Sequence, residues 1–270
     1  MLDLQRFRAI LFDMDGVLYR GSMLLPGVHE LLAYCDEHNI AYACVTNNST
    51  LTAEQYETKL ADMGVHIQSV HIVTSSVATR RYLAQHVPRN TGIYYIGMKG
   101  LQQALFEDGY YVYTEENPAY VVVGADFELT YAKLRTACLA IRAGAQFIGT
   151  NPDTTFPSEA GIIPGAGSIL ALLRSATDVE PFIIGKPAPT MFQTASTILN
   201  AQPSETLVVG DRLDTDIAGA HAANMSSVLV FTGVTNAETL TQSEVQPDEV
   251  LADLPALLTR WKTLVEKSPS

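Results

Sequence analysis

Residues 9–18 read Ala9-Ile10-Leu11-Phe12-Asp13-Met14-Asp15-Gly16-Val17-Leu18, an apolar run that ends in two acidic residues and a glycine. Continuous apolar residues over a short run are typical of a β-strand that is covered on both faces. Asp13 and Asp15 follow at the point where the strand gives way to a turn. If both side chains face one site, a divalent cation would relieve their repulsion. Taken alone, the pattern fits a solvated turn at a strand end equally well.

Apolar runs of strand length recur along the chain and alternate with helical stretches. They lie at residues 9–12, 41–45, 72–74, 120–123, 147–150, 182–184, 207–209 and 228–231. One helix is predicted to begin at a capping box, Thr52-Ala53-Glu54-Gln55, and to end at Gly64. Because strands and helices alternate, we predict an α/β fold with a mainly parallel sheet.

Two later strand ends carry groups that suit a phosphate. Thr46, Asn47 and Asn48 follow the run at 41–45, and a hydroxyl with amides suits phosphoryl oxygens, although it suits a turn equally well. Lys186 lies within Ile184-Gly185-Lys186-Pro187, where its ammonium could offset negative charge in a pocket. Considered alone, this segment is explained more simply by an exposed surface lysine.

A fourth strand end is acidic: Val209-Gly210-Asp211 is followed by Asp214 and Asp216 near the start of a predicted helix. Asp211 is placed as a metal ligand. Asp216 has two interpretations, contact with the metal through water or capping of the helix. For Asp214 we favour capping.

Composition restricts the class of protein. The chain has 270 residues, of which 47% are hydrophobic, enough for one large or two modest cores. Its formal net charge of -12 would repel a nucleic-acid backbone, so no nucleic acid polymer is expected as a partner. There is no apolar stretch of membrane-spanning length and no signal-peptide pattern, so we expect a cytoplasmic protein without a membrane partner. Its cysteines, Cys35, Cys44 and Cys138, are expected to be buried free thiols.

The strand ends also indicate how the chain is organised. Runs near both ends of the chain finish in acids, amides or hydroxyls, whereas residues 80–180 have fewer such endings. Ligands of open parallel sheets bind beyond the carboxyl ends of strands. We therefore expect the two ends of the chain to form one catalytic domain and the middle to be an insertion.

Together the four segments, D-M-D-G-V-L-Y, V-T-N-N-S, G-K-P and G-D-R-x-x-T-D-I, resemble the motifs of the haloacid dehalogenase superfamily of aspartate-nucleophile hydrolases. The residues that fill these motifs are similar to those of subfamily IIA, which includes NagD, para-nitrophenyl phosphatases, phosphoglycolate phosphatases and pyridoxal phosphatases. The resemblance covers essentially the whole chain. It implies a Rossmann-like parallel-sheet core at 1–79 and 181–270, with an inserted α/β cap domain at 80–180. It also implies a homodimer formed through the cap.

The resemblance further implies a Mg²⁺-dependent phosphatase acting on a small phosphorylated metabolite. Asp13 would be the nucleophile that forms an aspartyl-phosphate, and Asp15 the general acid and base. The metal would be held by the Asp13 carboxylate, the Asp15 carbonyl and Asp211, with Asp216 nearby. Thr46, Asn47, Asn48 and Lys186 would bind the phosphoryl group.

Three further points follow from these motifs. In the implied cap, the segment Ile163-Pro164-Gly165-Ala166-Gly167-Ser168 opens a predicted helix, where its N–H groups either meet an anion or only begin the helix. Dehalogenases of the superfamily lack a counterpart of Asp15, which favours phosphate ester hydrolysis. The alternatives that remain are a phosphotransferase of the same fold and a non-catalytic module that binds a phosphate ligand.

Overall fold

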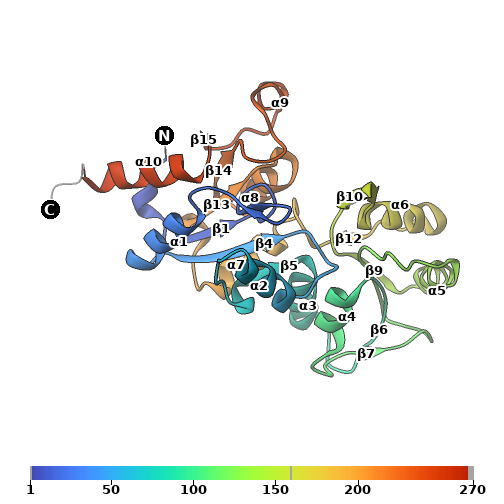
Figure 1. The fold of residues 1–270 in the computed structure, drawn as a ribbon. Coiled ribbons are helices and arrows are strands. Elements are labelled where there is room, and N and C mark those ends of the chain that lie inside the picture. The colour runs from blue at the N-terminus through green and yellow to red at the C-terminus, as the bar shows by residue number, and fades with distance from the viewer. Residues whose placement is uncertain (1, 159, 267–270) are drawn as a thin grey trace. The chain divides into compact units, whose positions relative to one another are not determined.

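The apolar run at the start of the chain forms strand β1 (Ala9–Phe12), and all four of its residues are buried. In the computed structural model, which describes residues 2–158 and 160–266, β1 lies inside a six-stranded sheet of order β15-β14-β13-β1-β4-β5 (Figure 1). β13 (Thr206–Gly210) and β4 (Ala41–Thr46) flank it, and both run parallel to it. This confirms the predicted α/β fold with a parallel sheet.

The chain divides into two compact units. Unit 1 consists of the described residues of Met1–Thr46, Glu57–Ile72 and Pro187–Ser270, and unit 2 consists of the described residues of Asn47–Tyr56 and Val73–Lys186. The predicted cap, residues 80–180, falls within unit 2, while its exact boundaries stay predictions. The chain passes to unit 2 after Thr46 and returns to unit 1 at Glu57. It passes to unit 2 again after Ile72 and returns after Lys186.

The other strands of this sheet, a two-stranded hairpin and the surrounding helices follow in chain order. They are β2 (Tyr19–Arg20), β3 (Met23–Leu24), α1 (Val28–Glu37), α2 (Ala53–Asp62), β5 (Ile72–Thr74), α7 (Thr190–Ile198), α8 (Ala218–Ala222), β14 (Ser226–Val230), α9 (Ala237–Gln242), β15 (Glu249–Leu251) and α10 (Leu254–Glu266). A π-helical turn, η4 (Leu213–Ile217), precedes α8, and 3-10 turns occupy Leu4–Arg6, Ser69–His71 and Pro203–Glu205.

Unit 2 has a parallel sheet of its own, with the strand order β12-β9-β8-β6-β7. Its elements are α3 (Ser75–His86), β6 (Gly92–Ile96), α4 (Lys99–Phe106), β7 (Val112–Tyr113), β8 (Tyr120–Val123), α5 (Tyr131–Arg142), β9 (Gln146–Gly149), the hairpin β10 (Thr155–Ser158) and β11 (Gly161–Pro164), α6 (Ala166–Thr177) and β12 (Phe182–Ile183). Its core is formed by side chains from β6, β8, β9, α5 and α6, among them Ile96, Val121, Phe147 and Leu173. This second core shows that unit 2 is an α/β domain by itself.

The predicted capping box is confirmed. The Thr52 hydroxyl accepts the Gln55 N–H at 3.2 Å, and the Gln55 side chain accepts the Thr52 N–H at 2.9 Å. The chain then leaves α2 at Gly64, whose φ of 86° is favourable for glycine. Strands β2, β3, β6, β7, β10, β11 and β15 were not predicted. All except β6 are short and partly exposed, whereas β6 was missed although most of it is buried.

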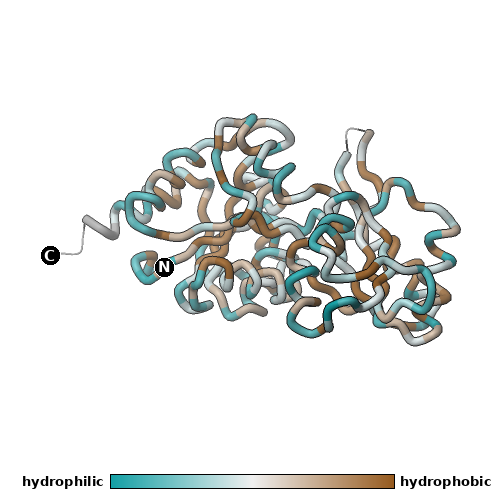
Figure 2. Tube along the Cα trace, turned by 90° about the horizontal axis from the view of Figure 1, so that it is seen from below, coloured by the Kyte–Doolittle hydropathy of each residue, from teal (hydrophilic) through white to brown (hydrophobic). Residues whose placement is uncertain are grey.

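Hydrophobic residues concentrate on the strands inside each unit, as the brown segments of Figure 2 show. Among residues 2–158 and 160–266, no helix combines the length and apolar character needed to cross a membrane. The three cysteines are free thiols as predicted, but only Cys35 and Cys44 are buried, since Cys138 is half-buried on α5.

Leu11 offers a test of how far the central strand supports unit 1. It is fully buried in β1, so Leu11→Ala is expected to lower the free energy of unfolding by about 2–5 kcal/mol through lost burial and a residual cavity. The matched control is Leu139→Ala, because Leu139 is 62% exposed and its loss should change stability by less than about 0.5 kcal/mol. Urea unfolding followed by circular dichroism measures both, and equal effects would contradict the expectation.

Candidate active site

Three carboxylates meet beyond the carboxyl ends of β1 and β13. One oxygen each from Asp13, Asp211 and Asp216 lies within 4.8 Å of the others. The strand register brings two of them near each other: Phe12 pairs with Val209, Asp13 directly follows β1, and Asp211 directly follows Gly210, the last residue of β13. The Asp13 N–H extends this ladder by donating to the Val209 carbonyl at 2.9 Å.

Asp216 enters this carboxylate cluster from the π-helical turn η4. Its Oδ2 accepts the N–H groups of Asp211 at 3.2 Å and of Arg212 at 3.1 Å. The side chain therefore holds the loop that follows β13, which is a capping function, and it also belongs to the cluster. Of the two sequence interpretations, the backbone contact is observed, and a role toward a metal stays a prediction.

Asp214 pairs with a neighbouring arginine in addition to contacting N–H groups of the turn in which it lies. Both of its carboxylate oxygens accept from the Arg212 guanidinium, at 3.1 and 2.8 Å. This pairing is the main reason that the pKa of Asp214 is lowered, and the N–H groups of Asp214 and Thr215 add to it. Asp214 lies outside the carboxylate cluster, so it is a surface ion-pair residue.

The donor set of the cluster fits a hard divalent cation. All three groups are carboxylates, and Asp211 and Asp216 are each 1% exposed while Asp13 is half-buried. Buried carboxylates at this spacing repel one another unless a cation or protons neutralise them. Oxygen ligands of this kind are those that Mg²⁺ and Ca²⁺ prefer. The interpretation of Asp13 as part of a solvated turn does not describe this arrangement.

The loop after β14 surrounds Asp211. Val234 donates its N–H to Asp211 Oδ2 at 2.6 Å, and Thr235 donates its N–H to the Asp211 carbonyl at 3.1 Å. Gly233 allows this close approach, because a Cβ there would lie 1.8 Å from Asp211 Oδ2. Sequence reasoning missed this loop, since Thr232-Gly233-Val234-Thr235 contains no acidic or metal-binding side chain.

Asp15 has surroundings different from those of Asp13. Its carboxylate is not one of the three in the cluster, and the residue is exposed. Partial burial of the carboxyl raises the pKa of Asp15, while the charges of Lys59 and Arg20 oppose that rise. Lys59 reaches this region from α2 with its Nζ 4.0 Å from the centre of the Tyr19 ring. No sequence signal marked Lys59, because helix α2 carries it in an ordinary amphipathic pattern.

Lys186 is buried in unit 2, with 3% of its surface exposed. This excludes the interpretation of an exposed surface lysine. The Asn47 side chain holds its backbone: Asn47 Oδ1 accepts the Lys186 N–H at 2.8 Å, and Asn47 Nδ2 donates to the Lys186 carbonyl at 3.0 Å. Two predicted site residues far apart in sequence are thus joined directly.

The backbone of Asn47 is fixed from two other sides of unit 2. Its carbonyl accepts the Ser75 hydroxyl and the Asn151 side-chain amide, both at 2.7 Å. Asn48 forms a local turn instead, because its Oδ1 accepts the N–H and hydroxyl of Thr50 at 2.7 and 2.8 Å. The binding of a phosphoryl group by Asn47 and Asn48 stays a prediction.

Thr46 is the last residue of β4 and is half-buried. It therefore lies in unit 1, whereas Asn47, the next residue, belongs to unit 2. Its contact with a phosphoryl oxygen stays a prediction.

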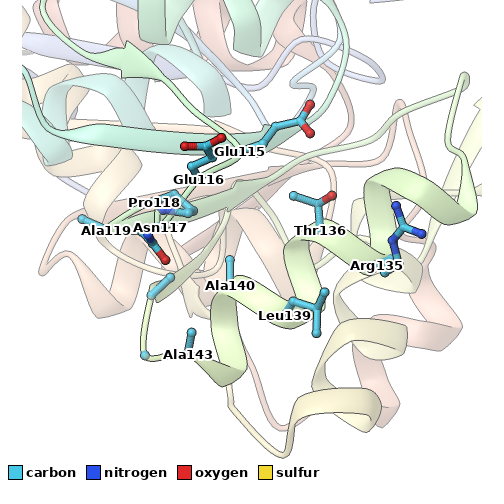
Figure 3. A pocket seen from close by; sticks show the side chains of 12 residues that line it. Glu115, Glu116, Asn117, Pro118, Ala119, Arg135, Thr136, Leu139, Ala140 and Ala143 are labelled. Atoms are coloured by element: carbon cyan, nitrogen blue, oxygen red, sulfur yellow. The ribbon is translucent and has the colours of Figure 1, made fainter.

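A different part of unit 2 contains a cavity of about 670 Å³. Figure 3 shows it between the segment at residues 115–119 and helix α5, with Glu115, Glu116 and Arg135 among its lining. None of the predicted site residues lines this cavity, so we assign it no part in the reaction.

The glycine-rich segment before α6 begins that helix and packs closely against the chain. The Gly167 N–H donates to the Asp153 carbonyl at 2.8 Å. Because this N–H is engaged within the protein, the segment matches the simpler of its two interpretations, that of helix entry.

Comparison with known proteins gives matches over most of the chain. A family described as haloacid dehalogenase-like hydrolase matches residues 10–111, and one described as HAD hydrolase-like matches residues 183–257. The chain is 38% identical over 251 residues to the acid sugar phosphatase of Staphylococcus saprophyticus, which covers 93% of this chain and 96% of that protein.

Two solved structures extend the comparison. The 4-nitrophenylphosphatase from Thermotoga maritima has a TM-score of 0.91 and 36% identity, covering 97% of this chain and 100% of that chain. The glycerol phosphate phosphatase from Mycobacterium tuberculosis, solved in complex with magnesium, has a TM-score of 0.85 and 32% identity, covering 94% of this chain and 77% of that chain.

The close approach of Gly233 to Asp211 can be tested with Gly233→Ala. The added Cβ would displace the Asp211 carboxylate, so we expect Mg²⁺ binding to weaken by about tenfold or more, the range seen when groups that orient a ligand are lost. Gly109→Ala is the control for a loss of stability without contact to Asp211, because Gly109 lies in unit 2, its φ of 63° strains an alanine, and a Cβ there meets nothing within 4 Å. Isothermal titration calorimetry measures both affinities, and unchanged binding in Gly233→Ala would count against a metal at Asp211.

Proposed function

We propose a reaction for this chain on the premise that it belongs to the haloacid dehalogenase-like hydrolases, in the subfamily of NagD and the para-nitrophenyl phosphatases, and is a phosphatase. The reaction is the hydrolysis of small-molecule phosphate monoesters through an aspartyl-phosphate on Asp13. The observation that carries this proposal is the cluster of Asp13, Asp211 and Asp216 beyond neighbouring strands.

The cation proposed for this cluster is Mg²⁺. The carboxylates of Asp13 and Asp211 would hold it together with the Asp15 carbonyl, and Asp216 would support the site. When bound, the ion offsets the negative charge of the phosphoryl group, which otherwise repels an anionic nucleophile. The magnesium complex of the Mycobacterium tuberculosis phosphatase is consistent with this choice.

Asp13 is proposed as the nucleophile because it is the half-buried member of the cluster. A carboxylate oxygen of Asp13 attacks phosphorus in line, the bond from phosphorus to the leaving alkoxide breaks, and the phosphoryl group remains on Asp13. Water then attacks the same phosphorus, the bond from phosphorus to the Asp13 oxygen breaks, and inorganic phosphate leaves with the Asp13 carboxylate restored. The ladder bond from the Asp13 N–H to Val209 keeps the nucleophile fixed during both steps.

Asp15 is proposed to move the protons. It follows the nucleophile by two residues and lies outside the cluster, so its carboxyl is available for proton transfer. It protonates the leaving alkoxide in the first step and takes a proton from the attacking water in the second. One residue can do both because it regains in the second step the proton that it lost in the first.

Lys186 is proposed as the positive side chain that binds the phosphoryl group, with Thr46 and the Asn47 N–H as hydrogen-bond donors. Its burial supports this, because a lysine is rarely retained in a protein interior unless its charge has a use there. The Asn47 side chain, bonded to both the N–H and the carbonyl of Lys186, would keep the lysine backbone in place.

The names of the relatives define a panel of substrates. Acid sugar phosphatase, 4-nitrophenylphosphatase and glycerol phosphate phosphatase indicate that small phosphate monoesters are the compounds to test. The panel should hold sugar phosphates, glycerol phosphate, phosphoglycolate, nucleotides and pyridoxal phosphate. Release of free phosphate without an added alcohol distinguishes a hydrolase from a phosphotransferase.

The nucleophile is tested with Asp13→Asn, which keeps the size of the side chain and removes its charge. We expect Mg²⁺-dependent phosphate release from 4-nitrophenyl phosphate to fall below detection, with an unchanged circular dichroism spectrum. Asp214→Asn is the matched control, because Asp214 pairs with Arg212 outside the cluster and its loss should leave turnover near that of the unaltered protein. Near-normal activity of Asp13→Asn would refute the scheme.

The general acid is tested with Asp15→Asn and two substrates. A 4-nitrophenolate leaving group needs little protonation, whereas the alkoxide of glycerol phosphate needs it strongly. We therefore expect the first-turnover rate to fall about 10²–10⁴-fold for glycerol phosphate and much less for 4-nitrophenyl phosphate. Rapid-quench measurement of the first turnover gives both rates, and an equal loss on both substrates would argue against proton donation by Asp15.

A further inference from the structure

Hydrogen bonds in unit 1 connect an exposed arginine to the loop that contacts the carboxylate cluster. Arg20, on β2, donates from Nε and Nη2 to the Thr232 carbonyl, at 2.8 and 2.5 Å. The Thr232 hydroxyl donates to the Gly16 carbonyl at 2.6 Å. Arg20 thus ties the turn after β1 to the loop after β14, which are more than 200 residues apart in sequence.

Asp211 lies against both of these segments. Two residues beyond Thr232, the Val234 N–H donates to Asp211 Oδ2 at 2.6 Å. From the other side, a Cβ on Gly16 would lie 2.8 Å from the same oxygen and 3.0 Å from the Gly233 Cα. The turn and the loop therefore pack against one oxygen of the Asp211 carboxylate so closely that neither Gly16 nor Gly233 could carry a Cβ without a shift.

We propose that Arg20 is a positioning residue for the metal site, acting through Thr232 and Val234 on Asp211. A carboxylate can rotate about its bond to Cβ, and an N–H bonded to one oxygen restricts that rotation. The N–H can do so only if its loop stays in place, and the two bonds from Arg20 to Thr232 hold the loop. This inference rests on the proposed function, in which Asp211 binds Mg²⁺.

Arginine suits this position better than lysine. Its planar guanidinium presents two N–H groups to one carbonyl at once, which fixes the direction of approach as well as the distance. Lysine offers a single ammonium on a flexible stem, so it would hold the loop less firmly. Arg20 does not belong to the carboxylate cluster, and we assign it no contact with substrate.

The test compares Arg20→Met and Arg20→Lys with Arg142→Met. Arg142 is the matched control, because it also donates to a backbone carbonyl, that of Ala176 at 3.2 Å, but in unit 2. Titration calorimetry with Mg²⁺ should give a Kd about tenfold or more higher in Arg20→Met, the range of lost ligand-orienting groups. Arg20→Lys should be intermediate, and Arg142→Met should match the unaltered protein.

A second measurement needs no metal. Amide hydrogen exchange at Val234 in the metal-free protein should be about tenfold faster in Arg20→Met, while amides of β1 and β13 keep their protection. At saturating Mg²⁺ the kcat of Arg20→Lys should be nearly that of the unaltered protein, because lysine keeps the positive charge that acts on Asp15 and only the orientation of Asp211 is loosened.

The outcomes separate this inference from the proposed function. If the unaltered protein does not bind Mg²⁺, the proposed function fails, and the exchange at Val234 still decides whether Arg20 holds the loop. If the unaltered protein binds Mg²⁺ and Arg20→Met binds it equally well, the positioning role is refuted. It is also refuted if exchange rises equally throughout unit 1, since the effect would then be a general loss of stability.

Discussion

Mutual repulsion among Asp13, Asp211 and Asp216 is the constraint around which unit 1 is arranged. One oxygen of each lies within 4.8 Å of the others, and two of the residues are almost fully buried. Repulsion of this kind would push the groups apart unless each one were fixed independently. Asp13 is fixed by the ladder between β1 and β13, Asp211 by N–H groups of the loop after β14, and Asp216 by N–H groups of the loop after β13. The three carboxylates stay close together because the backbone groups that hold them come from different parts of unit 1.

Both units use the main chain to place charged side chains. In unit 1 the Val234 N–H engages the Asp211 carboxylate, and in unit 2 the Asn47 side chain engages the N–H and the carbonyl of Lys186. Backbone groups are rigid when they are themselves bonded, so they set position with little loss of entropy on binding. The functional side chains thus depend on neighbours that carry no charge.

The sequence identifies the functional residues at the strand ends, but not the residues from other elements that hold them in place. Asp13 and Asp211 were predictable because each follows a continuous apolar run and strand ends of a parallel sheet share one edge. Lys59 and Gly233 were not, because their importance comes from approaches across the fold that leave no local pattern. The ion pair of Asp214 with Arg212 was not predicted either, although the two residues are only two positions apart.

The pairing of β1 with β13 has a consequence for how the protein is made. Ala9 pairs with Ala41 of β4 and with Thr206 of β13, so one of the two partners of the central strand is synthesised only after the whole of unit 2. Parallel pairing over such a separation is slow to form, because a long loop must close first. A chain released early from the ribosome would carry Asp13 without Asp211. The carboxylate cluster can therefore form only after unit 2 has been synthesised, and a chain that stops before Asp211 lacks it.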